Sequence, residues 1–276
     1  MFRKRKTDSS AENGLWDPTV VSPVSPGYPQ LGPGLYVTSV SLIGGRKNQQ
    51  DVLDYRPLQG GGLAAVLCDG MGGLSGGALA ARTACSGFFQ ECGSWDTAPD
   101  LPGLARKLDR RVSQLRGEDG LPLDGGSTLT AVMVRDSCFH WLSVGDSRIG
   151  LFRDGQIFWL NRLHNYQLEL DEALYSGELS QAEYEAELPR GHALLSYLGC
   201  GYLKYIDFKT DQTLAPSDIL LLCSDGFYDL LPETTLPAVL AALDKTLTNL
   251  PDLLAPYLGQ TTRRMDNASA VIMRYR

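Results

Sequence analysis

The chain has 276 residues, with 32 Asp and Glu against 25 Lys and Arg, which gives a net charge of −7. A chain of this length buries a sizeable core, and 43% hydrophobic with 21% charged residues is the composition of a globular protein rather than a disordered one. The acidic balance argues against a general nucleic-acid-binding protein, so we expect no nucleic-acid partner.

Composition also bears on membranes and compartment. No uncharged apolar run approaches the roughly 20 residues that a membrane helix needs. The opening "MFRKRK" is followed by polar residues and not by the apolar stretch of a secretion signal. The six Cys contain no CxxC pair, which favours free thiols in a reducing compartment. We therefore expect a cytoplasmic protein without stable membrane insertion.

The first part of the chain differs from the rest. Residues 1–34 hold five of the 15 Pro, mixed with Ser and Gly. Such a segment buries too little apolar surface to offset its ordering entropy. We therefore predict a flexible tail over residues 1–34, with basic residues near its start, and one folded domain over residues 35–276.

From Leu35 onward, short runs rich in Val, Ile, Leu and aromatic residues predict strands. They read "LYVTSVSLI", "GLAAVLCD", "STLTAVMV", "CFHWLSVGD", "RIGLFRDG", "YIDFKTDQTL", "DILLLCSDG" and "ASAVIMRY". The "RDG" at 153–155 is a hairpin signal. Helical periodicity covers 76–92, 101–116 and 236–247, the last with Pro237 in its first turn. Because the strands cluster, we predict antiparallel sheets with helices on their outer faces, and not a doubly wound parallel sheet.

A polar, helix-prone segment covers residues 165–190. It is interrupted by "SG" and contains Ser180 as a candidate helix cap. We predict a helical insertion between strands here.

Five carboxylates lie at the ends of predicted strands. Asp69, Asp146 and Asp225 end strand-like runs, Asp266 opens the last run, and Asp51 follows the first run after a short loop. A single strand-end Asp is more often turn chemistry than a site. However, a strand that ends in Asp225 and an antiparallel neighbour that begins at Asp266 place both carboxylates at one sheet edge.

Such a cluster needs either protons or cations. Carboxylates about 4–5 Å apart repel by roughly 3–4 kcal/mol per pair at an effective dielectric constant near 20. The alternatives are therefore strongly raised pKa values or bound cations, and oxygen ligands without His or Cys select Mg²⁺, Mn²⁺ or Ca²⁺. Gly70 lets the backbone turn after Asp69, so that its carbonyl can face the same ion.

The motifs resemble those of the metal-dependent protein phosphatases, the type 2C serine/threonine phosphatases, in a bacterial form. In the family's order, "RKNQQD", "CDGMGG", "GGSTLTAVMV", "VGDSRIGLFRDGQI", "LCSDGFYDLL" and "DNASAVIMRY" resemble its six main motifs. Residues 165–190 resemble its flap. The resemblance runs over almost the whole chain from Leu35.

This resemblance implies an α+β fold, a four-layer α/β/β/α sandwich in which two antiparallel sheets are flanked by helices. It implies hydrolysis of phosphoserine and phosphothreonine in proteins by attack of a metal-bridging water, with two or three Mn²⁺ or Mg²⁺. It further implies a monomer and a cognate serine/threonine kinase as a plausible partner. By the same resemblance, the substrate phosphate is bound by Arg46, and the metal ligands are Asp51, Asp69, Gly70, Asp146, Asp225 and Asp266.

The chain departs from the family pattern at two positions. Gln50 stands where many members have Glu, and Met71 stands where the eukaryotic form has a His. Because Met cannot donate a proton, we expect a bound water to protonate the leaving group.

Two other functions compete with a phosphatase. "GLSGG" fits G-x-S-x-G after a strand, which would make Ser75 the nucleophile of a serine hydrolase. The "DG" directly after the strand displaces Ser75 from the required position. The other alternative is a phosphatase-like scaffold that binds phosphoproteins without turnover, although all five aspartates are present.

The charge is consistent with a metal site. Without the five aspartates, the rest of the chain has a net charge of −2, so most of the acidic surplus can sit in one cleft. Two divalent ions would return four positive charges.

Overall fold

The computed structural model describes residues 34–58, 61–73, 76–92, 99–117, 119–258 and 265–276. The predicted tail lies outside these described residues except for Gly34, and Ser75 lies outside them as well. The boundary between a flexible tail, residues 1–34, and a folded domain, residues 35–276, therefore stays a prediction.

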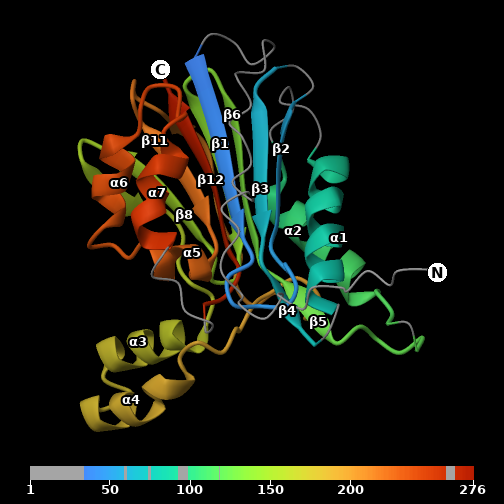
Figure 1. The fold of residues 1–276 in the computed structure, drawn as a ribbon. Helices are drawn as coiled ribbons and strands as arrows, with labels where there is room; N and C mark the ends of the chain where they lie inside the picture. Colours follow the sequence, from blue (N-terminus) through green and yellow to red (C-terminus); the bar gives the residue numbers. More distant parts are fainter. Residues whose placement is uncertain (1–33, 59–60, 74–75, 93–98, 118, 259–264) are drawn as a thin grey trace, which may run out of the picture.

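Two five-stranded antiparallel sheets form the centre of the molecule (Figure 1). The first sheet has the strand order β1 (Leu35–Leu42), β12 (Ala268–Tyr275), β11 (Ile219–Cys223), β8 (Arg148–Arg153) and β9 (Gln156–Trp159). The second sheet has the order β10 (Asp207–Thr213), β7 (Cys138–Val144), β6 (Leu129–Arg135), β3 (Leu63–Cys68) and β2 (Val52–Pro57). A short pair, β4 (Gly70–Gly72) and β5 (Gly125–Ser127), continues from the end of β3.

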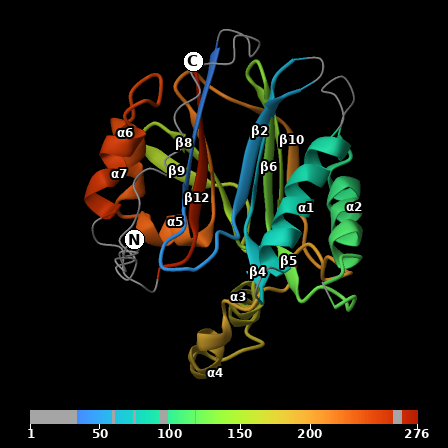
Figure 2. The same cartoon turned by 45° about the vertical axis from the view of Figure 1, so that its right-hand side comes forward.

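Helices cover the outer face of each sheet (Figures 1 and 2). The second sheet packs against α1 (Gly76–Glu91) and α2 (Leu101–Ser113), and the first against α5 (Asp225–Leu230), α6 (Leu236–Ala242) and α7 (Leu250–Leu258). A third apolar cluster lies between the sheets and includes Trp141, Ile149 and Val271. The predicted α+β fold, an α/β/β/α sandwich, is confirmed.

Local sequence signals explain several boundaries. The "RDG" hairpin is confirmed: Arg153 pairs with Gln156, and Asp154 and Gly155 both have positive φ, at 51° and 80°. The side chain of Asp100 caps α2 by accepting the Gly103 amide. Both the hairpin and the helix cap depend on residues close together in the sequence, and such local features can be recognised from the sequence alone.

The third predicted helix is shorter than its apolar periodicity indicates. The helix α6 ends at Ala242, although the apolar pattern continues to Leu247. The carboxylate of Asp244 accepts the amides of Thr246 and Thr248 and so offers the backbone an alternative to the helix. Leu247 has a positive φ of 61° but is fully buried. The prediction of a helix to residue 247 is therefore wrong at its C-terminal end.

The predicted insertion is a helical hairpin made of α3 (Tyr166–Ser176), α4 (Gln181–Glu187) and a short 3₁₀ turn, Leu188–Arg190. We call residues 165–190 the flap. Ser180 caps α4 through a capping box with Glu183. Leu170 is the one buried residue of α3, and α4 has none. The flap accordingly extends away from the sandwich below the ends of the strands (Figures 1 and 2).

None of the helices among the described residues is long and apolar enough to cross a lipid bilayer.

Candidate active site

Strand register brings all five predicted aspartates to one end of the sandwich. In the first sheet, Cys223 at the end of β11 pairs with both Ala270 of β12 and Arg148 of β8. Asp225 therefore follows β11 at the same edge where Asp266 precedes β12 and Asp146 precedes β8. In the second sheet, Val52 pairs with Cys68. Asp51 and Asp69 are the next residues beyond that pair, and both sheets present these ends on the same side of the molecule.

A cleft of about 290 Å³ opens at this end. Its lining includes Asp69, Gly70, Asp146, Asp225 and Asp266, so the structure brings five of the predicted residues together. The predicted phosphate ligand, Arg46, also lines the cleft.

Asp51 lies behind the cleft and is 5% exposed. Its Oδ2 accepts the Ser224 hydroxyl at 3.0 Å, whereas its buried Oδ1 has no hydrogen-bond partner among the described residues. Burial raises the pKa of Asp51 to about 6, and the charge of Asp225 adds to the rise. A buried carboxylate oxygen without a donor is a natural ligand for a cation.

The pKa values of three other aspartates are also raised by burial and by neighbouring negative charges. Burial raises the pKa of Asp69 well above its ordinary value, and repulsion from the other four aspartates raises it further. Burial, together with the charge of Asp225, raises the pKa of Asp146 to about 6. Burial and then the Asp266 charge raise the pKa of Asp225. The cluster therefore meets the expectation of raised pKa values in the absence of cations.

Two hydroxyl groups join the turns that carry Asp69 and Asp146. Thr128 Oγ1 accepts the Asp69 amide at 2.9 Å and lies 2.8 Å from Ser147 Oγ. Thr128 and Ser147 are both buried. Sequence reasoning did not identify either residue, although Ser147 directly follows Asp146 and Thr128 stands within the quoted "GGSTLT".

The two arginines of the motifs behave differently. Arg46 lies at the cleft and pairs with Asp266. Arg148 stacks its guanidinium over Tyr228 at 3.9 Å and over Trp159 at 5.1 Å. Arg148 therefore supports the packing of α5 and β9 at this end of the first sheet.

The two departures from the family pattern both line the cleft. Gln50 donates through its side-chain amide to the Gly72 carbonyl at 3.5 Å, and Met71 is partly exposed. His192, from the segment after the flap, lines the cleft as well and was missed by sequence reasoning. No motif signals it, because its placement depends on how the flap returns to the sandwich.

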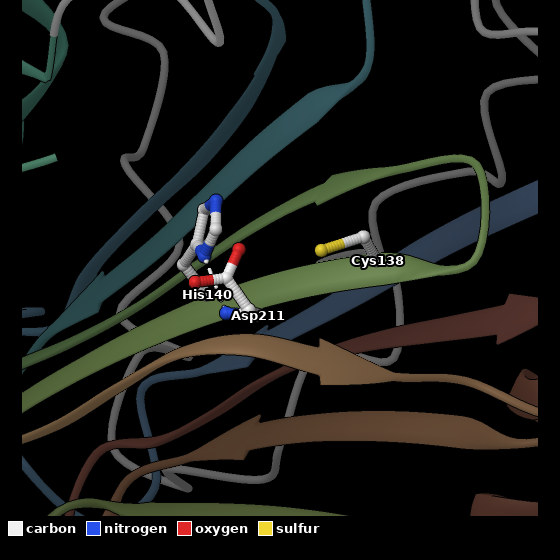
Figure 3. A group of neighbouring side chains, drawn as sticks. All are labelled: Cys138, His140 and Asp211. Atoms are coloured by element: carbon white, nitrogen blue, oxygen red, sulfur yellow. Dashed lines mark hydrogen bonds between the residues drawn. The ribbon is translucent and has the colours of Figure 1, made fainter. Parts of the chain in front are cut away.

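A different group of metal-ligating side chains lies toward the other end of the second sheet. Figure 3 shows Cys138 and His140 on β7 beside Asp211 of β10. Among the described residues, it is the one group of three or more such side chains whose ligand atoms all lie within 4.8 Å of one another. His140 Nδ1 already accepts the Asp211 amide at 3.0 Å, so this lone pair is committed to the strand pairing.

The five aspartates do not form a group of that compactness, which suits ligands distributed around more than one ion. Their donors are oxygens, they are largely buried, and Arg46 is the one cationic side chain that forms an ion pair with them among the described residues. This chemistry fits Mg²⁺ or Mn²⁺. Fold and site together agree with the class that the sequence motifs resemble, the metal-dependent phosphatases.

Comparison with known proteins leads to the same class. The model of the family described as "Protein phosphatase 2C" matches residues 41–269. The serine/threonine phosphatase stp of Listeria monocytogenes serovar 1/2a is 33% identical over 197 residues, which cover 68% of this chain and 75% of that protein.

Among solved structures, the Streptococcus agalactiae serine/threonine phosphatase superposes with a TM-score of 0.72 at 22% identity, covering 87% of this chain and 98% of that one. The catalytic domain of the phosphatase PstP, solved in complex with two manganese ions, superposes with a TM-score of 0.62 at 23% identity, covering 88% and 98%. These likenesses confirm the fold.

The chain belongs to the protein phosphatase 2C family. It is a serine/threonine phosphatase of this metal-dependent family, and its substrates are phosphoproteins.

Proposed function

We propose that this chain hydrolyses phosphoserine and phosphothreonine with two or three Mn²⁺ or Mg²⁺ held by Asp51, Asp69, Asp146, Asp225, Asp266 and the Gly70 carbonyl. The observation that carries the proposal is the buried Asp51, whose Oδ1 has no donor, beside four aspartates that line one cleft. The PstP structure with two manganese ions supports a count of at least two.

Phosphate monoesters need the chemistry that such ions provide. Their uncatalysed hydrolysis is so slow that enzymes accelerate it by up to ~10²¹-fold, whereas a single general acid or base supplies about 10²–10⁴. Bound divalent ions would supply an activated water nucleophile and neutralise the phosphoryl oxygens during in-line attack.

The protein groups would orient the substrate. Arg46 offers a planar fork of donors at the rim of the cleft, which matches two phosphoryl oxygens. The Gly70 carbonyl is held in place by the backbone, because β4 pairs Gly70 with Ser127. Thr128 keeps the Asp69 turn in register with β6.

We further propose that the chain acts as a cytoplasmic monomer, and that a cognate serine/threonine kinase produces its substrates. The expectation of a cytoplasmic location rests on the free cysteines and on the lack of an apolar membrane segment in the sequence. Gel filtration with light scattering tests the monomer. Phosphoproteomics of a deletion strain tests the kinase by showing whether the accumulating sites share one kinase motif.

The first experiment measures hydrolysis of p-nitrophenyl phosphate and of a phosphothreonine peptide by the full chain. EDTA should abolish both activities, and Mn²⁺ should restore them. Asp225→Asn should lower kcat by about 10²–10³-fold or more, as expected for a group that acts on transition-state charge, and should weaken Mn²⁺ binding. Asp252→Asn, an exposed aspartate of α7, is the matched control.

The outcome also separates the alternatives. A scaffold without turnover would bind the phosphopeptide but release no phosphate at any Mn²⁺ concentration. A serine hydrolase would lose activity in Ser75→Ala, which we expect to be fully active. Near-normal turnover of Asp225→Asn in chelator would contradict the metal mechanism.

A further inference from the structure

The segment between β9 and α3 holds the turn that carries Asp146. Asn161, which is 8% exposed, accepts the Ile149 amide at 2.7 Å through Oδ1. Its Nδ2 donates to the Ser147 carbonyl and to Ser143 Oγ, both at 2.9 Å. The residue directly after Asp146 is therefore fixed by an amide side chain of this segment.

His164 fixes the residue directly before Asp146. Its ring is fully buried, and Nδ1 accepts the Gly145 amide at 3.1 Å. In return, the His164 amide donates to the Gly145 carbonyl at 3.0 Å. Gly145 has a φ of 104°, and a Cβ there would lie 2.7 Å from the Thr128 side chain, so the turn has little freedom to relax. Asp146 is thus held on both sides by side chains only three residues apart.

The carboxylate of Asp207 sets the tautomer of this histidine. Because Nδ1 accepts a hydrogen bond, Nε2 carries the proton. This nitrogen lies 3.3 Å from Asp207 Oδ1, although it makes no hydrogen bond among the described residues. Arg162 binds Asp207 through its backbone amide at 2.9 Å and its guanidinium at 2.7 Å. Although burial opposes it, the nearby His164 ring and the hydrogen bonds from Arg162 lower the pKa of Asp207. Asp207 therefore stays ionised opposite the imidazole N–H.

The same residues connect the turn to the flap. Arg162 Nη1 lies 3.8 Å from Glu172 of α3. The His164 ring packs against the Tyr205 ring with 5.6 Å between centroids, and the Tyr205 hydroxyl donates to Glu169 of α3 at 3.1 Å. The His164 carbonyl also accepts the Leu195 amide at 2.9 Å, where the chain returns from the flap.

We propose that His164 and Asn161 are positioning residues that aim the Asp146 carboxylate into the cleft and couple its hold on a divalent cation to the flap. The proposal rests on the proposed function, in which Asp146 is a metal ligand. Groups that orient a ligand typically change metal affinity by about 10–100-fold when they are removed. Here the orientation runs from Asp207 through His164 to the Gly145 peptide.

The test compares His164→Leu, which removes the acceptor, with His164→Asn, whose side-chain oxygen can replace Nδ1. Two readouts are made on the EDTA-treated full chain: Mn²⁺ titration calorimetry, and hydrogen exchange of the Gly145 amide. We expect His164→Leu to weaken the weakest Mn²⁺ site by about 10–100-fold and to speed Gly145 exchange at least tenfold. His164→Asn should restore most of both, and Asp207→Asn should fall between them.

Two reference variants separate the possible failures. Val134→Ala truncates the buried core at the far end of β6 and should change stability without changing the Mn²⁺ sites. Asp146→Asn should weaken the same Mn²⁺ site as His164→Leu while leaving Gly145 protected. If Asp146→Asn weakens Mn²⁺ binding but His164→Leu behaves like Val134→Ala, the positioning role is overturned. Unchanged Gly145 exchange in His164→Leu also overturns it, whether or not the Mn²⁺ affinity changes. An Asp146→Asn variant with unaltered Mn²⁺ binding would instead remove Asp146 from the proposed ligands.

Discussion

The guanidinium of Arg46 donates to the carboxylate of Asp266 across the rim of the cleft, with 2.5 Å between Nη2 and Oδ2. The two side chains are 57% and 40% exposed, so solvent screens the pair, and its worth is at most about 1 kcal/mol. The proposed phosphate ligand and a proposed metal ligand thus neutralise each other when neither has its own partner. A divalent ion at Asp266 would therefore free Arg46 for the phosphate at small cost.

The first prediction follows from this exchange of partners. Arg46→Ala should raise KM for a phosphopeptide by about 10–100-fold, since a charge-assisted bidentate contact is worth roughly 1.5–3 kcal/mol. Mn²⁺ affinity should change less than about fivefold, because the ion pair that is lost is weak. Steady-state kinetics and Mn²⁺ titration calorimetry measure the two effects. Lys47→Ala is the control on the neighbouring exposed residue. A collapse of Mn²⁺ affinity with an unchanged KM would assign Arg46 to the metal site and not to the substrate.

The second prediction concerns the pH dependence of stability without cations. The folded pKa values of Asp51 and Asp146 are about 6, above the ordinary 3.8. Their contribution to stability is therefore complete below pH 3.8 and is lost as the pH rises through 6. In EDTA, Tm should fall by a few degrees between pH 5 and pH 7.5, at about 1 kcal/mol per carboxyl group. Saturating Mn²⁺ should raise Tm more at pH 7.5 than at pH 5.

The control for this pH dependence is Asp146→Asn, which removes one of the titrating groups and should flatten the slope in EDTA. Burial lowers the pKa of His140, which gives a slope of the opposite sign in the same range, but it does so equally in both proteins. A Tm that rises with pH in EDTA, with the same slope in both proteins, would contradict the raised pKa values assigned to the aspartates of the cleft.

The third prediction tests the backbone at Gly70. A Cβ at this position would lie 2.3 Å from the Gly77 carbonyl oxygen and 2.7 Å from that of Gln50, and both are backbone atoms that cannot move aside. Gly70→Ala should therefore lower the free energy of unfolding by about 2–4 kcal/mol and abolish Mn²⁺-dependent turnover. At Gly73, a Cβ would be 3.4 Å from Asp124 Oδ2, an ordinary contact, so Gly73→Ala should change stability by less than about 0.5 kcal/mol. Urea unfolding in EDTA measures both, and equal losses would show that the loop is sensitive everywhere.

The fourth prediction concerns substrate recognition by the flap. Residues 165–190 contain seven Asp or Glu and a single Arg, a net charge of −6. Replacing residues 168–188 by a short Gly-Ser linker should lower kcat/KM for a basic phosphoprotein by about tenfold or more, roughly 1.4 kcal/mol. At saturating Mn²⁺, which offsets any loss of cation affinity on removal of the flap, turnover of p-nitrophenyl phosphate should stay within about twofold, because such a small substrate does not reach the flap. The loss should shrink at high salt, since screening weakens exposed charges. Equal losses on both substrates would assign the flap to the chemical step.

The fold was predictable because its strands can be recognised from local sequence patterns. Runs such as β11 are buried along their whole length and end in Gly or Asp, and antiparallel pairing then dictates that Asp225 and Asp266 share an edge. The end of α6 was not predictable from periodicity, because the Asp244 turn, a local hydrogen-bonding alternative, ends the helix inside an apolar repeat.

The carboxylates of the candidate site were predictable from the sequence, but the residues that position them were not. The roles of His164, Asn161 and Thr128 follow from no local pattern, and the partners described above lie 12 to 59 residues away in the sequence. Their roles depend on tertiary contacts that close only when both sheets and the flap are assembled. The acidic surplus likewise divides between two places, because the flap carries a charge of −6 in addition to the five aspartates.

The flap has one buried residue over α3 and α4, Leu170. Substitutions over most of its surface therefore cost little folding free energy, whereas the strand ends that carry the aspartates tolerate almost none. Evolution can thus alter the residues that a phosphoprotein would meet at the flap while the proposed metal ligands stay unchanged. We expect related phosphatases to diverge fastest in this hairpin, so that one catalytic apparatus serves many signalling pathways.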